Sequence, residues 1–394
     1  MRRFLLLLSL SVSVFGQTKL EDLERMALAS SPSLQQASAQ IRVAAGRAKQ
    51  AGLYPNPIFG ATGDHNTPAL NGGSLGGFAE QRIVTGGKLG LDQKTADEDR
   101  LTAEEMARAE RLRVLAEIRT LYYRGLGEQR LLDVRKRMAE LAERTAGVSR
   151  ELKNVGQADQ PNVLEAEIEA QRAQLGATMA ENALARTWRE IGEMTGLKRS
   201  TLEGDLETLP ALDSEAELAR ILRESPRIRA AEIDAARSAL VLRRAKAEVI
   251  PDIVARGGIR YNRELLPYPV GPEGYFDVGV SVPLFNRNQG AREAANADQE
   301  RARAQAAKER LELTRQFASL YREYADATAA AVRYRDELLP KARQGFEMFQ
   351  ASFRQMAAAY PNVLSSQRTL IQMEEEYIEQ LVTAWRAKVE IEAL

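Results

Sequence analysis

The chain has 394 residues, equal numbers of basic and acidic residues, no cysteine and one histidine. The absence of cysteine excludes disulfides and thiolate metal ligands, and the balanced charge gives no support to nucleic-acid binding. A high content of Ala, Glu, Arg, Gln and Leu with few aromatic residues is typical of long helical segments.

The N-terminus predicts export. Residues 1–16 combine a basic start, Met1-Arg2-Arg3, with an apolar stretch and small residues just before Gln17. This is the pattern of a cleaved signal peptide, and a retained anchor is the alternative. No later segment reaches about 18 continuous apolar residues, so no transmembrane helix is expected.

An internal repeat organises the rest of the chain. The tetrapeptide at 161–164, Pro-Asn-Val-Leu, returns about 200 residues later at 361–364. The chain therefore reads as one structural repeat written twice, at 17–196 and 214–394, joined by a linker at 197–213. Further matches occur in the same order: Leu121-Tyr122 with Leu320-Tyr321, Trp188 with Trp385, Ser31-Pro32 with Ser225-Pro226, and Tyr54-Pro55-Asn56 with Ile250-Pro251-Asp252.

The first repeat predicts helices around two strands. Thr18 and Glu21 form a potential capping box, which starts a helix that Pro32 restarts. A Gly- and Pro-rich stretch follows, and then a long segment without proline whose apolar residues recur at helical spacing. Gly125 and Gly127 within it suggest a kink or a change of register. The expected elements are a helix to about 50, strands at about 53–66 and 75–84, a helix at about 88–154, a tip at about 155–160 and a helix at 161–194.

The second repeat predicts the same plan. Ser214 and Glu217 repeat the capping box, and the strands at about 250–262 and 274–284 alternate between two faces. Alternation over about ten residues is typical of a transmembrane β-strand, although a soluble sheet with one wet face is the alternative. Arg256 and Arg260 fall on the polar face and are barrel-lumen candidates. A long helix is expected at about 286–351, a tip at about 355–360 and a last helix at 361–394.

Four strands cannot close a barrel, and an open sheet edge is not tolerated in hydrocarbon. The smallest closed bacterial barrels have about 8 strands. The chain is therefore expected to oligomerise, and three copies would supply twelve strands.

The sequence offers no catalytic centre. His65 is a lone histidine beside Asp64 in a loop-like stretch, and no G-x-S-x-G motif is present. We therefore expect no catalytic residue, no cofactor and no metal-ligand set, and the chain is not expected to be an enzyme.

Three motifs carry a resemblance to a known family. They are the segments 51–57 (Ala-Gly-Leu-Tyr-Pro-Asn-Pro), 81–88 (Gln-Arg-Ile-Val-Thr-Gly-Gly-Lys) and 282–285 (Val-Pro-Leu-Phe). With the repeat, they make the chain resemble the TolC-like family of outer-membrane efflux channels, and its heavy-metal (cation) efflux branch in particular. The resemblance covers nearly all of the mature chain.

The resemblance implies a fold and partners. The fold is mainly α with a small β part, and a homotrimer shares one twelve-stranded outer-membrane β-barrel on a periplasmic α-helical tunnel of coiled-coil hairpins. The protein would reside in the outer membrane, in contact with its lipid, with a periplasmic extension. A periplasmic adaptor (membrane fusion) protein would link it to an inner-membrane pump of the proton-driven resistance-nodulation-division type, which supplies the energy.

The resemblance also implies site residues. Adaptor-docking tips map to Val155, Gly156 and Gln157 in the first repeat and to Met356, Ala357 and Ala358 in the second, which lacks the glycine. Some family members have a ring of acidic residues at the tunnel entrance. The matching positions here are Asn162, Glu165, Asn362 and Ser365, of which Glu165 alone is acidic, so weaker cation selectivity is expected.

The leading function is therefore passive export of small solutes, with metal cations or drugs as the candidate cargo, through a tripartite efflux system. The outer channel of a type I protein-secretion system is an alternative with the same architecture. A periplasmic coiled-coil adaptor or structural protein is a further alternative, which two similar hairpins with paired strands disfavour.

Overall fold

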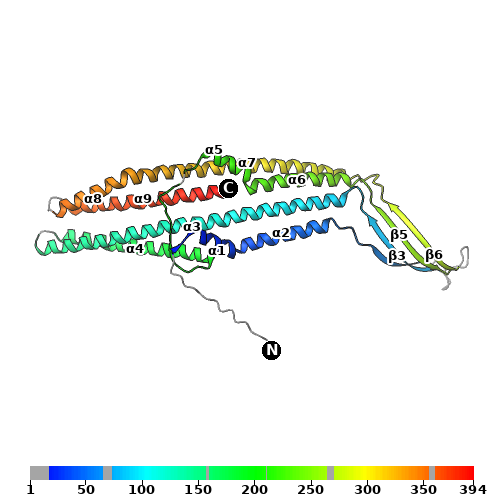
Figure 1. The fold of residues 1–394 in the computed structure, drawn as a ribbon, viewed down its shortest axis with the longest axis horizontal. Helices are drawn as coiled ribbons and strands as arrows, with labels where there is room; N and C mark the ends of the chain where they lie inside the picture. The colour runs from blue at the N-terminus through cyan, green and yellow to red at the C-terminus, as the bar shows by residue number, and fades with distance from the viewer. Residues whose placement is uncertain (1–16, 65–72, 157–158, 210, 264–269, 355–359) are drawn as a thin grey trace, which may run out of the picture. The chain divides into compact units, whose positions relative to one another are not determined.

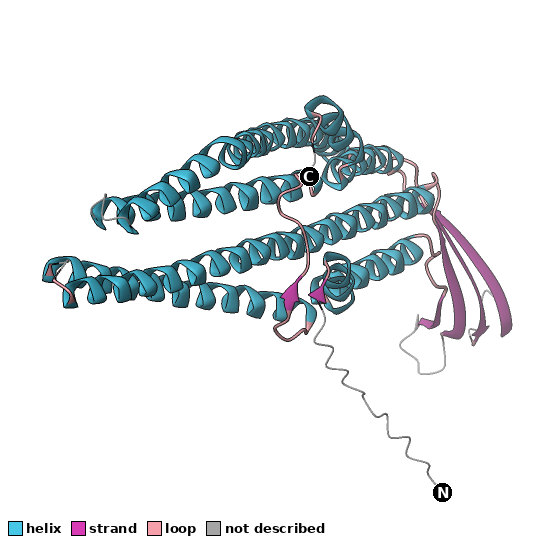
Figure 2. Cartoon of the chain, turned by 60° about the vertical axis from the view of Figure 1, so that its left-hand side comes forward, coloured by secondary structure: helices cyan, strands magenta, loops and turns pink. Residues whose placement is uncertain are grey.

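The computed structural model describes residues 17–64, 73–156, 159–209, 211–263, 270–354 and 360–394, so the predicted signal peptide at 1–16 and His65 lie outside it. Long helices dominate, and four strands form one antiparallel sheet (Figure 1, Figure 2). The chain divides into two compact units. Unit 1 comprises residues up to Leu34, 110–221 and 313–394, and unit 2 comprises 35–109 and 222–312. Each unit therefore takes segments from both sequence repeats.

The predicted fold class, mainly α with two long helical hairpins and four strands, is confirmed. The first half contains β1 (Gln17–Thr18), α1 (Leu20–Ser30), α2 (Pro32–Ala51), β2 (Ile58–Asp64), β3 (Ser74–Ile83), α3 (Lys88–Asn154) and α4 (Gln160–Thr195). The second half contains β4 (Thr201–Leu202), α5 (Ser214–Glu224), α6 (Pro226–Ala247), β5 (Ile253–Asn262), β6 (Gly271–Val280), α7 (Gln289–Arg333), the π-helical turn η1 (Tyr334–Leu338), α8 (Leu339–Arg354) and α9 (Tyr360–Glu392).

Both predicted capping boxes are wrong. Lys19 is the N-cap of α1 and makes no side-chain cap bond. Thr18 instead lies in β1, which pairs in parallel with β4. At α5 the cap is Asp213, whose Oδ1 accepts hydrogen bonds from the N–H groups of Glu215 (3.0 Å) and Ala216 (3.2 Å). The cap is therefore Asp213, one residue before the predicted Ser214, and it binds the free N–H groups of the first turn.

Helix α3 has the predicted bounds. It follows Gly86 and Gly87, whose φ values of 66° and 67° lie in the left-handed region that glycine adopts readily. The helix continues through Gly125 and Gly127, where we expected a kink or change of register. A Cβ at Gly127 would lie 2.3 Å from Cγ2 of Val382 in α9. These glycines therefore serve close packing against neighbouring segments.

The second long helix is not one continuous α-helix, in contrast to the prediction. Pro340 has no N–H for the carbonyl of Asp336, and its ring crowds that carbonyl. The chain responds with the π turn η1, in which the N–H of Leu339 bonds to the carbonyl of Tyr334. Helix α8 then continues to Arg354.

The four predicted strands are present, in the order β2-β3-β5-β6 with antiparallel pairing throughout. Their outer bounds are shorter than predicted. The first strand begins at Ile58 rather than near 53, and the last ends at Val280 rather than near 284. Pro55, Pro57 and Pro283 lack the N–H that ladder pairing needs, which accounts for both differences.

The linker 197–213 is held by side chains of unit 1. Leu202 and Leu206 are buried in its main core cluster. The side-chain amide of Gln129 accepts from the N–H of Leu202 (2.8 Å) and donates to its carbonyl (3.2 Å). Nε1 of Trp385 donates to the carbonyl of Leu206 at 2.9 Å. The repeat-equivalent hydroxyls of Tyr122 and Tyr321 donate to the carbonyls of Glu203 (2.5 Å) and Leu212 (3.4 Å).

Small residues form the core nearer the hairpin ends of unit 1. One cluster joins Ala142 and Ala146 of α3 with Ala166 and Ala170 of α4 and with Leu364 of α9. Alanine side chains allow helix axes to approach closely. Ala-rich faces of α3 and α4 therefore pack closely within unit 1.

Candidate functional site

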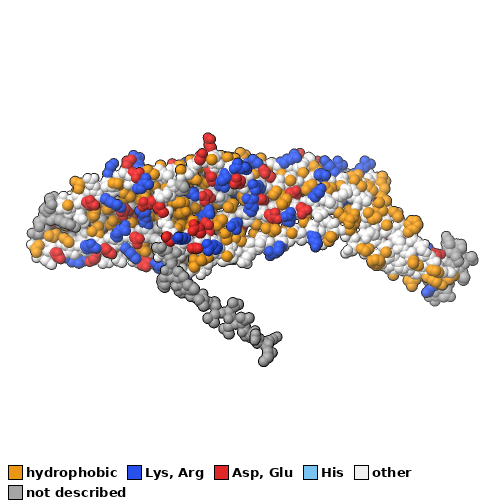
Figure 3. Space-filling model, viewed as in Figure 1, with side chains coloured by type: hydrophobic (Ala, Val, Ile, Leu, Met, Phe, Trp, Pro, Cys, Tyr) orange, Lys and Arg blue, Asp and Glu red, His pale blue; other side chains and the backbone are white. Residues whose placement is uncertain are grey.

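One face of the sheet is apolar and exposed. Phe276 is 82% exposed and Phe59 is 77% exposed, although both are large aromatic side chains. Figure 3 shows hydrophobic side chains, in orange, over the strands. An exposed apolar patch of this kind marks contact with a membrane or a partner. The apolar face is formed by Phe59, Leu75, Ile259, Tyr261, Phe276, Val278 and Val280, which the ladder register places on the same side.

Arg256 and Arg260 lie on the opposite face, as the alternation predicts. Nε of Arg256 lies 3.4 Å from Oε2 of Glu80 in β3, and its guanidinium lies 3.9 Å from the ring centroid of Phe78. Nε of Arg260 lies 3.3 Å from Oε2 of Glu273 in β6. Each arginine thus has a carboxylate partner on a neighbouring strand. This pairing weakens the local positive charge expected from the arginines alone.

The sheet is open. Along the described strands, β2 pairs only with β3 and β6 only with β5. The outer edges of both strands therefore keep free backbone donors and acceptors. Such edges favour pairing with another strand.

Two of the predicted docking residues lie in the described part of the first tip. Val155 is 68% exposed at the end of α3, and Gly156 has a φ of 76°. The N–H of Gly156 bonds to the carbonyl of Lys153 at 2.9 Å, which turns the chain out of the helix. The remaining tip candidates, Gln157, Met356, Ala357 and Ala358, lie outside the described residues.

The tunnel-entrance candidates are on the first turns of α4 and α9. Glu165, Asn362 and Ser365 are exposed, and Asn162 is half-buried. Their buried neighbours Val163, Ala166, Val363 and Leu364 face the packed side instead. These four polar side chains therefore lie away from the packed side of their helices.

An ion pair that was not predicted from the sequence joins these two helices. The guanidinium of Arg368 in α9 bonds to both carboxylate oxygens of Glu169 in α4, at 2.6 and 3.2 Å. Arg135 of α3 similarly reaches Glu375 of α9 at 2.8 Å. Glu169 and Arg368 carry opposite charges and occupy nearly equivalent positions in the two repeats. This was the signal in the sequence that could have revealed their ion pair.

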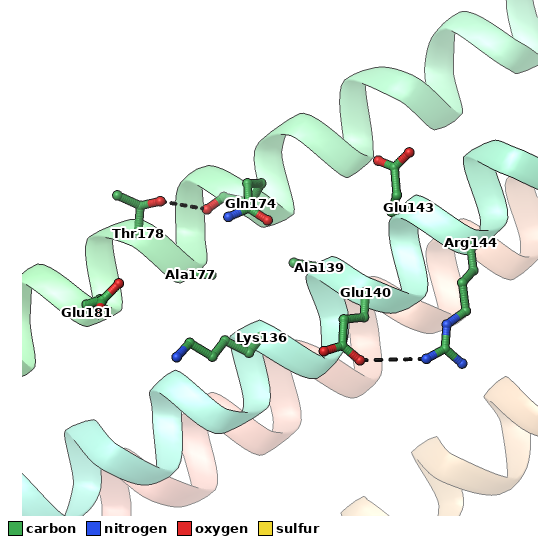
Figure 4. A pocket seen from close by; sticks show the side chains of 9 residues that line it. All are labelled: Lys136, Ala139, Glu140, Glu143, Arg144, Gln174, Ala177, Thr178 and Glu181. Carbon is green, nitrogen blue, oxygen red and sulfur yellow. Dashed lines mark hydrogen bonds and ion pairs between the residues drawn. The ribbon is translucent and has the colours of Figure 1, made fainter.

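A groove of about 440 Å³ runs between α3 and α4 of unit 1 (Figure 4). Figure 4 shows Glu140 bridged to Arg144, and their N···O separation is 3.6 Å. Glu143 and Glu181 also line it, with Lys136. It is an open groove of mixed charge on a helical hairpin, without the enclosed apolar walls of a typical small-molecule site.

Asp252, just before β5, makes contacts that were not predicted from the sequence. Its carboxylate accepts from Nζ of Lys88 (2.9 Å), Nη2 of Arg82 (2.6 Å) and the N–H of Thr85 (3.1 Å). Burial raises the pKa of Asp252, but the hydrogen bonds from Lys88, Thr85 and Arg82 outweigh it and hold this pKa well below the ordinary range. The ionised carboxylate joins the end of β3, the start of α3 and the start of β5.

In the described part of the chain, no group of three or more His, Cys, Asp or Glu residues is placed to hold a metal ion. The helices described include none that is both long enough and apolar enough to cross a membrane.

Comparison with known proteins agrees with this architecture. The cobalt-zinc-cadmium resistance protein CzcC of Cupriavidus metallidurans is 22% identical over 384 residues, covering 96% of this chain and 90% of CzcC. The outer-membrane channel OprN has a TM-score of 0.80 at 18% identity and covers 95% of this chain and 89% of its own. CusC, whose structures concern transmembrane channel formation, has a TM-score of 0.75 at 17% identity and covers 95% and 91%.

The family model for outer membrane efflux proteins matches residues 23–197 and 218–393, one match in each repeat. These two segments include most of the chain and contain both helical hairpins and all four strands of the sheet. The chain therefore belongs to the outer membrane efflux protein family, as the resemblance predicted, and its location is the outer membrane.

Proposed function

We propose that this protein is the outer-membrane channel of a tripartite efflux system and conducts solutes passively to the exterior. The open sheet carries this proposal, because it combines an exposed apolar face, a polar face and two edges that pair on one side only. In a homotrimer, β6 of one copy would pair with β2 of the next, and twelve strands would close with the apolar faces outward. Arg256 and Arg260 would then line the lumen.

The helical hairpins would form a periplasmic tunnel whose free ends dock an adaptor protein. The exposed apolar Val155 and the turn at Gly156 suit a docking tip at 155–157, and 356–358 would be its counterpart. Asn162, Glu165, Asn362 and Ser365 would surround the entrance. Because Glu165 is the one acid among them, the entrance should be only weakly selective for cations.

The substrate class that we favour is small solutes, with metal cations first. The name of CzcC refers to resistance to cobalt, zinc and cadmium. A channel must bind the solute that it conducts only weakly, so that the solute can leave. An inner-membrane pump of the resistance-nodulation-division type would supply the energy. The name of CzcC also favours efflux over the alternative of a type I protein-secretion channel.

Planar-bilayer conductance of the purified, detergent-extracted protein tests the proposal, with the oligomeric mass measured on the same sample. A trimer that inserts and gives stable single-channel steps is the expected result. A monomer that never conducts, in bilayers where a known porin does, would overturn both the trimer and the channel. Reversal potentials in a KCl gradient should show weak cation preference, and strong preference would contradict the entrance assignment.

A further inference from the structure

The four connections between helices and strands meet at one end of the sheet. Both strand hairpins turn at the far end, so every strand begins or ends here. Nε of Arg244 in α6 bonds to Asp92 in α3 at 2.8 Å. Nδ2 of Asn288, just before α7, donates to the carbonyl of Ala245 at 2.9 Å. Nε2 of Gln81 donates to the carbonyl of Pro55 at 2.9 Å. These contacts, all within unit 2, hold the four connections together at this end of the sheet. We call this position along unit 2 the connection level.

The connections carry an excess of positive charge. Segments 43–57, 82–94, 243–252 and 281–293 contain ten basic residues and four acidic ones. The balance reverses further along α3, where residues 95–109 contain five acidic and two basic ones. Figure 3 shows the blue side chains at the helix ends that border the sheet. The excess is therefore local to the connection level of unit 2.

Most of the acidic side chains in these connections already form ion pairs. Asp92 pairs with Arg244, and Glu248 pairs with Arg244 and lies 4.0 Å from Nζ of Lys88. Asp252 pairs with Lys88 and Arg82. Three basic residues and three acids thus neutralise one another.

Seven basic side chains remain, and all are exposed. None of them makes an ion pair with the residues that the structure describes. Their positions lie within about six residues of a helix end, which at about 1.5 Å per residue is a layer roughly 9 Å deep. We call them the basic collar: Arg47, Lys49, Lys94, Arg243, Lys246, Arg287 and Arg292.

An exposed apolar layer lies between the basic collar and the sheet. Leu53 and Tyr54 precede β2 and are 52% and 63% exposed. Leu284 and Phe285 follow β6 and are 64% and 93% exposed. Along the chain, the order is an apolar strand face, then this apolar layer, then unpaired positive charge. The bilayer has the same order, with hydrocarbon followed by a headgroup region about 5–8 Å deep on each side.

We propose that the basic collar binds the headgroups of anionic phospholipids on the periplasmic side of the outer membrane. Guanidinium and ammonium groups donate to phosphate oxygens, and the exposed apolar layer contacts the acyl chains next to them. The inference rests on the placement of the sheet in the bilayer under the proposed function.

The test compares two variants of the full-length protein with equal loss of charge. The collar variant is Arg47→Gln, Lys49→Gln, Arg243→Gln and Lys246→Gln. The control variant is Arg172→Gln, Arg189→Gln, Lys198→Gln and Lys341→Gln, which removes four exposed basic residues of unit 1. Each protein, in neutral detergent, is titrated with phosphatidylglycerol or with phosphatidylcholine of the same acyl chains, and bound lipid is counted by native mass spectrometry.

We expect the unaltered protein and the control variant to prefer phosphatidylglycerol at least tenfold, with the preference falling as salt is raised. The collar variant should lose most of that preference. Equal preference in the two variants, or none in the unaltered protein, would overturn the proposal.

Conductance in pure phosphatidylcholine bilayers separates the two proposals. A collar variant that conducts normally but has lost the lipid preference supports both. If the unaltered protein never inserts, the channel assignment fails by itself. A collar variant that keeps the lipid preference but changes ion selectivity would place these residues in the pore and overturn lipid binding.

Discussion

Asp252 shows how one carboxylate can fix a junction between strands and helices. It is 10% exposed, and its partner Lys88 is 3% exposed. Removing one member of a buried ion pair leaves the other charge buried and unpaired. The resulting loss of folding stability is larger than the stability that a solvent-exposed ion pair contributes. The junction of β3, α3 and β5 should therefore be sensitive to this single side chain.

We predict that Asp252→Asn lowers the free energy of unfolding by about 3 kcal/mol, because Lys88 stays buried with only Glu248 nearby. Thermal melting followed by circular dichroism in detergent measures the change. Glu248→Gln, at a more exposed carboxylate, should cost less than about 1 kcal/mol. Adding Lys88→Met to Asp252→Asn should recover part of the loss, and no recovery would contradict the role given to Lys88.

The lowered pKa of Asp252 adds a pH dependence. A carboxylate whose pKa is depressed in the folded state stabilises that state fully above its unfolded pKa of about 3.9. The contribution is lost as pH falls from there through the lowered folded value. Between pH 5 and pH 2, the melting temperature of the unaltered protein should therefore fall more steeply than that of Asp252→Asn. Parallel curves would contradict this assignment.

Glycines within α3 give a third prediction at the residue scale. Gly127→Ala places a Cβ 2.3 Å from Cγ2 of Val382, a stiff β-branched side chain, and should destabilise by about 1–3 kcal/mol. Gly147→Ala in the same helix meets nothing within 4 Å and should stabilise by up to about 1 kcal/mol. Denaturant titration of both variants measures the difference, and equal effects would refute the close-packing explanation.

At the scale of elements, the linker is the segment that depends most on distant side chains. Its short strand β4 pairs with β1, while Gln129 supplies a side-chain amide that bonds as a second backbone would. Buried polar groups of the backbone require such partners. Side chains of α3 and α9 therefore help to order the linker, in addition to the hydrogen bonds that Asp205 accepts within it.

We predict that Gln129→Met frees both backbone groups of Leu202 without changing side-chain length. The N–H of Leu202 should then exchange hydrogen at least about tenfold faster, since an unmade buried bond costs about 1–3 kcal/mol. Hydrogen exchange with mass spectrometry over 197–209 measures it. Gln174→Met, at an exposed position on α4, is the control and should leave the linker unchanged.

Some of these elements follow from local sequence signals, and others depend on contacts between distant residues. Helix α3 was predicted to its bounds because periodicity, the lack of proline and the preceding glycines are all local signals. The role of the linker depends on contacts with residues such as Trp385, which no local pattern reports. The faces of Arg256 and Arg260 follow from alternation. Their partners Glu80 and Glu273 depend on a strand register that only the structure supplies.

At the scale of the whole molecule, the two faces of the sheet should tolerate charge differently. Val278 is 62% exposed on the apolar face, and Gly279, next to it, lies on the opposite face. Val278→Lys should cost about 2–4 kcal/mol if that face contacts lipid near the bilayer centre. Gly279→Lys should be tolerated, since a Cβ there meets nothing within 4 Å.

Oligomer recovered from outer-membrane fractions measures this difference. We expect the yield of assembled protein to fall strongly for Val278→Lys and to stay near normal for Gly279→Lys. An equal fall in the yield of both variants would mean that the strand tolerates no lysine. A fall for Gly279→Lys alone would mean that the assignment of the two faces is reversed.

The π turn η1 has a consequence for the relation between the two repeats. Tyr122 and Tyr321 are 199 residues apart, whereas Pro161 and Pro361 are 200 apart, and η1 lies between Tyr321 and Pro361. A turn with i to i+5 bonding contains one residue more than an α-helical turn and advances the axis little. The second repeat can thus hold an extra residue while α8 keeps the rotational phase that its packing against α9 needs. Deleting one residue within 334–338 should therefore make the spacing from Tyr321 to Pro361 equal to the spacing from Tyr122 to Pro161.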